Sequence, residues 1–285
     1  GIRVAESDAD LARLIPQAQS EAAAAFGDGG LYLERMVRDA RHIEVQILGD
    51  GQRAVHLFER ECSLQRRRQK VWEEAPAACL SDAARERVCA ASVRMAEAVG
   101  YRGAGTLEFL YEPARDAFYF MEMNTRIQVE HPVTEMITGV DLVAEMIRVA
   151  FGEPLSLQQA DLRIDGHAIE VRVNAEDPAQ GFMPFPGVAG AISVPAGVRF
   201  DTMLYEGYAI PPFYDSLLGK LIVHGADRDA ALAALREAIA GLRIDGLKTT
   251  LPLHAALARD PAVIAGETHT RWLEQWLETN TIEAA

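Results

Sequence analysis

The sequence lacks long apolar runs and paired cysteines. No run approaches the roughly 18 apolar residues that cross a bilayer, and the first residues do not show the charged-then-apolar pattern of a signal peptide. The three cysteines, Cys62, Cys79 and Cys89, form no CxxC pair, which argues against a disulfide framework and a structural zinc site. We therefore expect reduced thiols, a cytoplasmic protein and no membrane association.

Positive charge is scarce as well. The 285 residues contain 28 Lys and Arg against 42 Asp and Glu, a formal net charge of -14. Such a surface repels polyanions, so we expect no nucleic-acid partner and no anionic membrane surface. Apolar residues make up 49% of the chain, which excludes disorder and provides enough apolar mass for one large or two medium cores.

Several common catalytic motifs are absent from the sequence. Neither of the phosphate-binding glycine loops GxxxxGK[ST] and GxGxxG occurs. The nucleophile motif GxSxG and the zinc motif HExxH are missing too. These absences argue against a Walker-type or Rossmann nucleotide site and against a hydrolase.

Helical and extended patterns alternate along the chain. Periodicity and capping residues predict helices at residues 8–25, 82–99, 142–151, 228–242 and 270–277. Alternating apolar residues predict strands at 31–37, 42–48, 54–59, 105–111, 117–124, 167–174 and 217–224. The pattern lapses near residue 165, where we expect a boundary between a first domain (1–165) and a smaller second domain (166–285). The expected fold class is α+β.

The most informative polar group lies on two of these strands. Glu122 and Asn124 share a face because side chains two residues apart on a strand point the same way. If the strands 105–111 and 117–124 form a hairpin that pairs Glu108 near Glu122, two carboxylates and an amide oxygen converge. Such oxygens suit Mg2+ or Mn2+ shared with a nucleotide phosphate, because close like charges repel without a cation. The alternative is a solvated polar strand face.

A polar segment, 124–132, directly follows the second of these strands. Arg126 offers a rigid fork for a small oxyanion, and Glu130 is a candidate general base. We expect a structural role for His131, because no second His lies at metal-ligand spacing.

A basic run follows the strand at 54–59. Arg66, Arg67, Arg68 and Lys70 lie within five positions, which in so acidic a chain favours a phosphate or carboxylate pocket. The alternative is a nucleic-acid patch, which is disfavoured because the run lies between folded segments.

In the second domain, the strand 167–174 carries Glu170, Arg172 and Asn174 on one face. Arg172 either faces a bound anion across a domain cleft or belongs to an exposed cross-strand ion pair. The pattern leaves both possibilities open.

Taken together, these residues resemble the biotin carboxylases, the ATP-grasp subunits of acetyl-CoA, propionyl-CoA and pyruvate carboxylases. The resemblance is carried by residues 41–46, 63–76, 100–109, 122–140, 166–178 and 211–220. The run from Glu122 to Met136 is very specific to that family, and the tail at 246–254 and 270–274 resembles bacterial acetyl-CoA carboxylase subunits more weakly. The resemblance implies an ATP-grasp domain followed by a smaller mixed α/β biotin carboxylase C-terminal domain.

The resemblance also implies a role for individual positions. Two Mg2+ or Mn2+ ions would be held by Glu108, Glu122 and Asn124. ATP would be bound by Glu34, Arg35 and Val37 along the adenine, by His42 and Gln65 at the ribose, and by Arg68, Glu108 and Glu122. Bicarbonate and biotin would be bound by Lys70, Arg126, Gln128, Val129, Glu130 and Arg172. Catalysis would depend on Glu130, Arg172, Lys70 and Arg126.

The implied reaction joins bicarbonate to biotin. Glu130 would deprotonate bicarbonate, which would attack the terminal phosphate of ATP; the carboxyphosphate would break to carbon dioxide and phosphate. Phosphate would take the ureido proton of biotin, and Arg172 would stabilise the enolate. No Met-Lys-Met attachment motif is present, so biotin would arrive on a carrier protein or domain. Carboxyltransferase subunits, a homodimer and fatty acid biosynthesis through acetyl-CoA carboxylase are further implications.

Two features depart from the family pattern. Arg68 stands where many relatives have His, which keeps an anion contact and changes nucleotide contacts. Relatives carry an N-terminal domain and a glycine-rich loop with phosphate-binding lysines, and Gly1 to Val4 resembles the residues directly after that loop. Without the loop we expect ATP affinity and turnover to be severely reduced. The rival functions are another ATP-grasp ligase, which would join a carboxylate to an amine, and an inactive fragment or assembly subunit.

Overall fold

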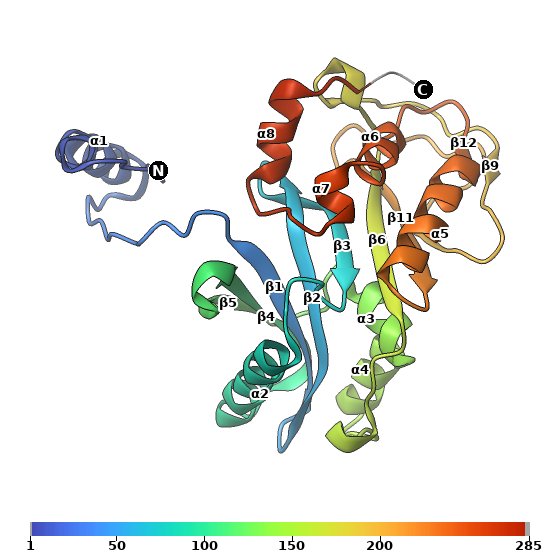
Figure 1. The fold of residues 1–285 in the computed structure, drawn as a ribbon, viewed down its shortest axis with the longest axis horizontal. Helices are drawn as coiled ribbons and strands as arrows, with labels where there is room; N and C mark the ends of the chain where they lie inside the picture. Colours follow the sequence, from blue (N-terminus) through green and yellow to red (C-terminus); the bar gives the residue numbers. More distant parts are fainter. Residues whose placement is uncertain (1, 283–285) are drawn as a thin grey trace. The chain divides into compact units, whose positions relative to one another are not determined.

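The computed structural model describes residues 2–282, and the chain divides into two compact units between Arg38 and Asp39. The first unit contains helix α1 (Asp8–Phe26) (Figure 1). Ser7 caps its start by accepting the N–H of Asp10, and Gly27 ends it in the left-handed conformation at φ 76°. The helix expected at 8–25 is therefore confirmed.

The strand expected at residues 31–37 is wrong. These residues have no regular secondary structure and no ladder partner among the described residues. Leu31, Tyr32 and Leu33 are exposed. An apolar run becomes a strand only where a neighbouring strand accepts its backbone hydrogen bonds, and the sequence pattern does not reveal such a neighbour.

The second unit is built on one antiparallel sheet of eight strands in the order β10-β11-β6-β3-β2-β1-β4-β5 (Figure 1). The strands are β1 (Arg41–Asp50), β2 (Ala54–Arg66), β3 (Gln69–Ala75), β4 (Arg102–Glu112), β5 (Ala117–Asn124), β6 (His167–Asn174), β10 (Arg199–Thr202) and β11 (Leu217–Gly225). The boundary expected near residue 165 stays a prediction, and the sheet passes it without a break because β3 pairs with β6.

Helices cover both faces of this sheet. They are α2 (Asp82–Ala98), α3 (His131–Thr138), α4 (Leu142–Ala150), α5 (Arg228–Gly241), α6 (Leu251–Leu257), α7 (Pro261–Ile264) and α8 (Trp272–Thr279). Short strands lie between them as β7 (Glu176–Asp177), β8 (Met183–Pro184), β9 (Ile192–Ser193) and β12 (Arg243–Ile244), with single 3-10 turns at Pro113–Arg115, Gln159–Asp161 and Pro178–Gln180. The mixture of helices and antiparallel strands confirms the α+β class.

Most of the expected elements are present, and the differences concern polar segments. The strand expected at 54–59 continues to Arg66 as β2, because its polar residues Glu59 to Ser63 are buried instead of marking a strand end. β3 and α3 were not expected as regular elements. β3 begins at Gln69 and α3 at His131, each within a polar run whose composition is typical of a loop.

Side chains of β1 alternate between two differently filled faces of the sheet. Val45 and Ile47 pack with α2 in an apolar core. Leu48, on the opposite face, packs with the buried Leu142 of α4. Further along that same face the even positions His42, Glu44 and Gln46 are polar and buried. This arrangement places a polar site inside the protein. Among residues 2–282 no helix combines the length and apolar content that a membrane span needs.

A buried ionic contact joins β3 to β6 and α5. Glu74 of β3 accepts hydrogen bonds from His167 Nε2 (2.8 Å) and Arg228 Nε (2.6 Å). Burial raises the pKa of Glu74, but the hydrogen bonds from His167 and Arg228 outweigh it and lower the pKa to about 2. This carboxylate therefore stabilises the folded state in its ionised form.

We expect the Glu74→Gln variant to lose about 3 kcal/mol of unfolding free energy at pH 7, because Arg228 loses its buried anionic partner and His167 loses a charged hydrogen-bond acceptor. A lowered folded-state pKa contributes stability above the unfolded value of 4.5, and this contribution is lost as pH falls through about 2. The difference in unfolding free energy between wild type and variant, measured by urea unfolding, should accordingly become smaller from pH 7 to pH 3. Glu86→Gln, on the exposed face of α2, is the control. A gap independent of pH would contradict the assignment.

Candidate active site

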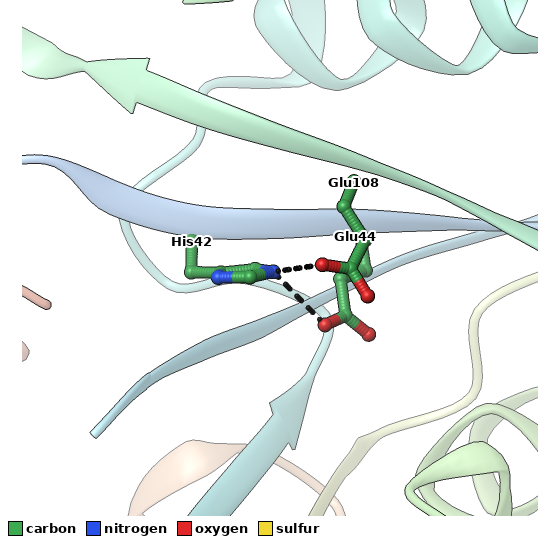
Figure 2. A group of neighbouring side chains, drawn as sticks. All are labelled: His42, Glu44 and Glu108. Atoms are coloured by element: carbon green, nitrogen blue, oxygen red, sulfur yellow. Dashed lines mark ion pairs between the residues drawn. The ribbon is translucent and has the colours of Figure 1, made fainter. Parts of the chain in front are cut away.

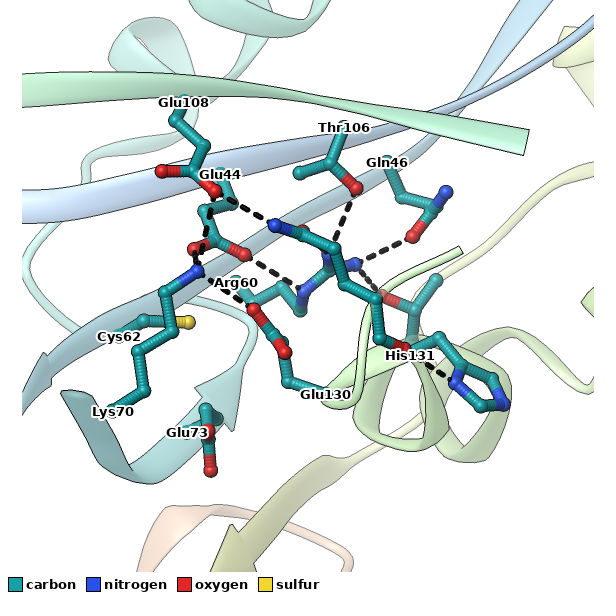
Figure 3. Close-up of polar contacts among 12 residues, drawn as sticks. Glu44, Gln46, Arg60, Cys62, Lys70, Glu73, Thr106, Glu108, Glu130 and His131 are labelled. Carbon is teal, nitrogen blue, oxygen red and sulfur yellow. Dashed lines mark hydrogen bonds and ion pairs between the residues drawn. The ribbon is translucent and has the colours of Figure 1, made fainter. Parts of the chain in front are cut away.

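Five neighbouring strands or segments contribute charged and polar side chains to one buried site. β1 supplies His42, Glu44 and Gln46, β2 supplies Arg60, and β3 supplies Lys70. β4 supplies Thr106 and Glu108, and the segment before α3 supplies Gln128 and Glu130. Figure 3 shows most of these side chains converging in the space between the sheet and α3. Buried charges are tolerated only when they are paired, so the contacts among them decide what the site can do.

Lys70 is the centre of the network. Its Nζ donates to Glu130 Oε1 (2.7 Å), to Glu108 Oε1 (3.3 Å) and to Glu44. Burial alone would lower the pKa of Lys70, but the charges of Glu44 and Glu130 outweigh it, so the net shift is upward. Lys70 is therefore a fixed positive charge among three carboxylates.

His42 directs one ring nitrogen at two of the same carboxylates (Figure 2). Its Nε2 is 3.1 Å from Glu44 Oε1 and 3.1 Å from Glu108 Oε2. Burial lowers the pKa of His42, but the hydrogen bonds to Glu108 and Glu44 outweigh it and raise the pKa to about 9. Gln65 Nε2 lies 3.0 Å from the other ring nitrogen, so the two side chains expected at the ribose are in contact.

Arg60 holds the polar side chains in place from the interior. Its guanidinium is fully buried and donates to Gln46 Oε1 (2.7 Å), Gln128 Oε1 (2.9 Å), Thr106 Oγ1 (3.1 Å) and Thr134 Oγ1 (3.1 Å). Gln128 is thereby oriented so that its Nε2 donates to a carboxylate, Glu108 Oε1, at 2.7 Å. One buried cation thus connects three strands to α3 and to the segment before it.

Glu130 is clamped between two cations. Its Oε1 accepts from Lys70, and its Oε2 accepts from Arg172 Nη2 at 3.0 Å. Arg172 also donates its Nε to Glu73 Oε1 (2.7 Å), so its guanidinium is shared between a carboxylate of β3 and Glu130. The alternative of an exposed ion pair for Arg172 is wrong, because both of its carboxylate partners are buried. A basic group flanked by two cations is suited to bind and deprotonate a small oxyanion.

The predicted hairpin pairing is confirmed. Glu108 of β4 lies opposite Glu122 of β5 in the ladder. Asn124 Nδ2 donates to Glu108 Oε1 (2.8 Å) and to Glu122 Oε1 (3.4 Å), so the three side chains meet on one face. Glu108 is buried, whereas Glu122 is exposed. A buried and an exposed carboxylate that meet at the surface fit a hard divalent cation that also binds phosphate oxygens.

The basic run does not form the single anion pocket that we expected. Arg67 and Arg68 occupy the two turn positions between β2 and β3 with φ of 49° and 65°, and both are exposed. In such a tight turn the two central residues lie beyond the ends of the paired strands and point away from the sheet. Arg66 lies over the ring of Phe182 at 3.8 Å. Among these cations Lys70 alone lies among the buried carboxylates, which corrects the expectation, and a nucleotide contact of Arg68 stays a prediction.

Several other predicted residues lie apart from the centre of the network. Arg126 is exposed and donates to Asn124 Oδ1 (3.3 Å) and to Ile127 O. Val129 contributes its backbone carbonyl, which accepts from Lys220 Nζ at 2.6 Å. The adenine residues expected at 34, 35 and 37 belong to the first unit, so their roles stay predictions.

Sequence reasoning missed four charged members of the site. No role was predicted from the sequence for Glu44, Arg60, Glu73 and Lys220. Each of them contacts a residue for which a role was predicted. A signal was available for Glu44, because it alternates with the apolar Ile43 and Val45 on a strand whose other polar neighbours were singled out. No comparable signal marks Glu73, which is adjacent to a second glutamate that faces the opposite side.

Comparison with known proteins adds family evidence to this geometry. Residues 1–158 match the family described as "Carbamoyl-phosphate synthase L chain, ATP binding domain", and residues 170–275 match the "Biotin carboxylase C-terminal domain". The chain is 53% identical over 280 residues to a biotin carboxylase of Pseudomonas aeruginosa, a match that covers 97% of this chain and 62% of that protein. It is 49% identical to a pyruvate carboxylase subunit of Methanothermobacter thermautotrophicus, with 97% and 56% covered.

A solved structure gives the same result at the level of the fold. The biotin carboxylase domain dimer of 2-oxoglutarate carboxylase from Hydrogenobacter thermophilus, in complex with MgADP, ADP and bicarbonate, matches with a TM-score of 0.88 and 44% identity. The match covers 96% of this chain and 61% of that one. The fold is thus an ATP-grasp domain with a biotin carboxylase C-terminal domain.

The chain belongs to the biotin carboxylase family. It spans about three fifths of the length of the relatives it matches, 62% for the protein of Pseudomonas aeruginosa.

Proposed function

We propose that the protein containing this chain carboxylates biotin, using ATP and bicarbonate. The observation that carries the proposal is the clamp on Glu130, whose two carboxylate oxygens each accept a hydrogen bond from a half-buried cation, Lys70 or Arg172. Family membership supports the same reaction, and one solved relative was obtained with MgADP and bicarbonate. We further propose that residues 1–165 and 166–285 form the two domains of this enzyme portion.

In the proposed mechanism the chain's own residues bind and activate bicarbonate. Lys70 and Arg172 attract the anion, and Arg126 completes its binding from the surface together with Gln128 and the backbone of Val129. Glu130 accepts the proton of bicarbonate, so that the resulting dianion can attack the terminal phosphate of ATP. Its two cationic partners then stabilise the charge that develops, since preorganised cations in a water-poor site contribute most of the help that phosphoryl transfer needs.

Glu108, Glu122 and Asn124 would hold Mg2+ or Mn2+ ions. Such ions neutralise the phosphate oxygens of ATP during transfer. Glu108 Oε1 is already oriented by Asn124 and Gln128, and Glu108 Oε2 lies 3.1 Å from His42 Nε2. His42, Gln65, Arg68 and the segment containing Glu34, Arg35 and Val37 would bind the nucleoside. After transfer Arg172 would stabilise the biotin enolate.

We expect Glu122→Gln to weaken Mn2+ binding about tenfold or more in the presence of ADP, because a neutral amide replaces one of the two carboxylates. Electron paramagnetic resonance of free Mn2+ measures the binding directly and does not depend on turnover. Glu153→Gln, an exposed residue after α4, is the control. Equal Mn2+ affinity in wild type and E122Q would remove Glu122 from the metal site.

We place the reaction in the acetyl-CoA carboxylase of fatty acid biosynthesis. The resemblance of residues 246–254 and 270–274 to bacterial acetyl-CoA carboxylase subunits supports this choice, whereas the similarity to a pyruvate carboxylase subunit supports a pyruvate enzyme. The proposed partners are a biotin carboxyl carrier protein or domain, carboxyltransferase subunits and a second copy of the chain, in the cytoplasm. Transfer of the carboxyl group from the carrier to acetyl-CoA or pyruvate, with the cognate carboxyltransferase added, distinguishes the two.

The decisive experiment is ADP release by the purified chain with and without bicarbonate and free biotin. Bicarbonate-dependent release supports biotin carboxylation. ADP release that a carboxylate–amine substrate pair stimulates without bicarbonate would favour another ATP-grasp ligase. No ADP release under any condition, with the fold intact, would favour an inactive fragment or assembly subunit.

A further inference from the structure

Two buried carboxyl groups face each other next to the Glu130–Arg172 contact. Glu73 of β3 lies directly opposite Glu170 of β6 in the ladder, and both residues have no exposed surface. Opposite residues on paired strands lie within side-chain reach and on the same face of the sheet. Ionising both groups would therefore place two negative charges together in the interior of the protein.

Hydrogen bonding to the two groups is incomplete. Glu73 Oε1 accepts from Arg172 Nε at 2.7 Å. Glu73 Oε2 and both oxygens of Glu170 have no hydrogen-bond partner among residues 2–282. An ionised carboxylate without a donor is very costly in a buried environment, whereas a protonated one can donate to a neighbouring carboxylate. The ladder register therefore allows a proton on Glu170 to be donated to Glu73.

Charged groups around the pair have other partners. The groups that face it are Arg60 and Cys62 of β2, Lys70 of β3, Glu130 before α3, Arg172 of β6, and Lys220 of β11. Lys220 Nζ donates to Val129 O and lies 3.6 Å from Asp201 Oδ2. The hydrogen bonds of Arg60, Lys70 and Arg172 go to groups other than Glu170. Within the described chain, no cation bonds to Glu170 to balance a charge there.

Electrostatics agrees with this geometry. Burial raises the pKa of Glu170 well above its ordinary value, and the neighbouring charge of Glu73 raises it further. Burial also raises the pKa of Glu73, to about 7, against the opposing effect of Arg172. The two groups titrate as a pair, and the proton that remains at neutral pH belongs on the member without a cation.

We propose that Glu170 is protonated at neutral pH and donates to Glu73, and that Glu73 is a positioning residue that keeps Arg172 directed at Glu130. Figure 3 shows Glu73 on the same side of the network as Glu130 and Lys70. The role for Arg172 rests on the proposed biotin carboxylation, but the shared proton does not. As pH falls through about 7, Glu73 becomes neutral and the Nε of Arg172 loses its charged acceptor.

The proton on Glu170 is tested by stability against pH. A group whose folded pKa is raised takes up a proton on folding, so it destabilises the fold progressively as pH rises above the unfolded value of 4.5. Gln needs no proton. We expect the Tm of Glu170→Gln relative to wild type to rise by about 3 °C or more between pH 5 and pH 8. The exposed Glu237→Gln on α5 is the control. A Tm difference that stays constant or falls with pH overturns the proposal.

The arginine itself provides a second measurement, the pH dependence of its Nε–H resonance. In protein labelled with 15N-arginine, the Arg172 Nε–H resonance is assigned by its absence from Arg172→Lys. We expect this resonance to shift with a midpoint near pH 7 in wild type and at the same midpoint in E170Q, because Gln imitates the protonated acid. A clearly lower midpoint in E170Q would mean that Glu170 is charged in wild type, and it overturns the shared proton.

Turnover tests the positioning role separately. We expect Glu73→Gln to lower kcat/KM for biotin about tenfold or more through misdirection of Arg172, with partial recovery in Glu73→Asp. Unchanged kinetics in E73Q overturn the positioning role. If neither wild type nor any variant releases ADP while the resonance of Arg172 still titrates near pH 7, the proposed function fails and the shared proton stands.

Discussion

Replacing Glu130 with Gln is expected to lower bicarbonate-dependent ADP release about 1,000-fold while ADP binding changes little. The reason is geometric, since among residues 2–282 Glu130 is the one carboxylate that accepts a hydrogen bond from Lys70 on one oxygen and from Arg172 on the other. A carboxamide keeps the size of the side chain but offers one acceptor in place of two, and it cannot take a proton from bicarbonate. The nucleoside contacts proposed for His42 and Gln65 do not involve Glu130.

The measurement is a coupled assay of ADP release with and without bicarbonate, together with calorimetric titration of ADP. Glu278→Gln on α8, an exposed residue, is the matched control. Glu130→Asp keeps the charge at a shorter reach and should retain more activity than E130Q. ADP release by E130Q at the wild-type rate would refute the assignment of Glu130 as the base.

The second large effect is expected from Arg60→Met. The guanidinium has no exposed surface, and its removal leaves the buried Glu44 without one of its cations and four other side chains without a donor. Removing one partner from a buried ionic network costs about 3–5 kcal/mol of unfolding free energy. For a chain of this size the corresponding drop in Tm is about 8 °C.

Thermal and urea unfolding of R60M measure this loss. Arg115→Met removes a largely exposed guanidinium and should leave the Tm unchanged within about 1 °C. Arg60→Lys keeps the charge with fewer donors and should fall between wild type and R60M. A variant R60M as stable as wild type would show that Arg60 contributes no net stability to the fold.

Much of the fold was predictable because the strands carry strong local signals. The hairpin from residue 105 to residue 124 and the strand 167–174 have alternating apolar side chains, and the structure confirms both. The limits arise where the partner of a segment decides its conformation. Residues 31–37 have the composition of a strand without a ladder, whereas β3 gains its ladders from β2 and β6 on either side.

The candidate site was predictable to the extent that its residues belong to a specific motif. Lys70, Glu108, Gln128, Glu130 and Arg172 were named from the sequence and are brought together in one network. Glu73 and Arg60 were not, because nothing local distinguishes a buried charge from an exposed one on a polar strand. The prediction of a single anion pocket from the basic run was wrong for the same reason, because Arg67 and Arg68 are exposed turn residues.

The ladder between β3 and β6 also affects how the chain is made. Residues 69–75 leave the ribosome well before residues 167–174, so the outer edge of β3 has no partner during the synthesis of nearly a hundred residues. An unpaired strand edge is a template for wrong association between chains. The run Glu73-Glu74 carries two negative charges on that edge, which makes pairing with another copy of the same edge unfavourable until the native strand arrives.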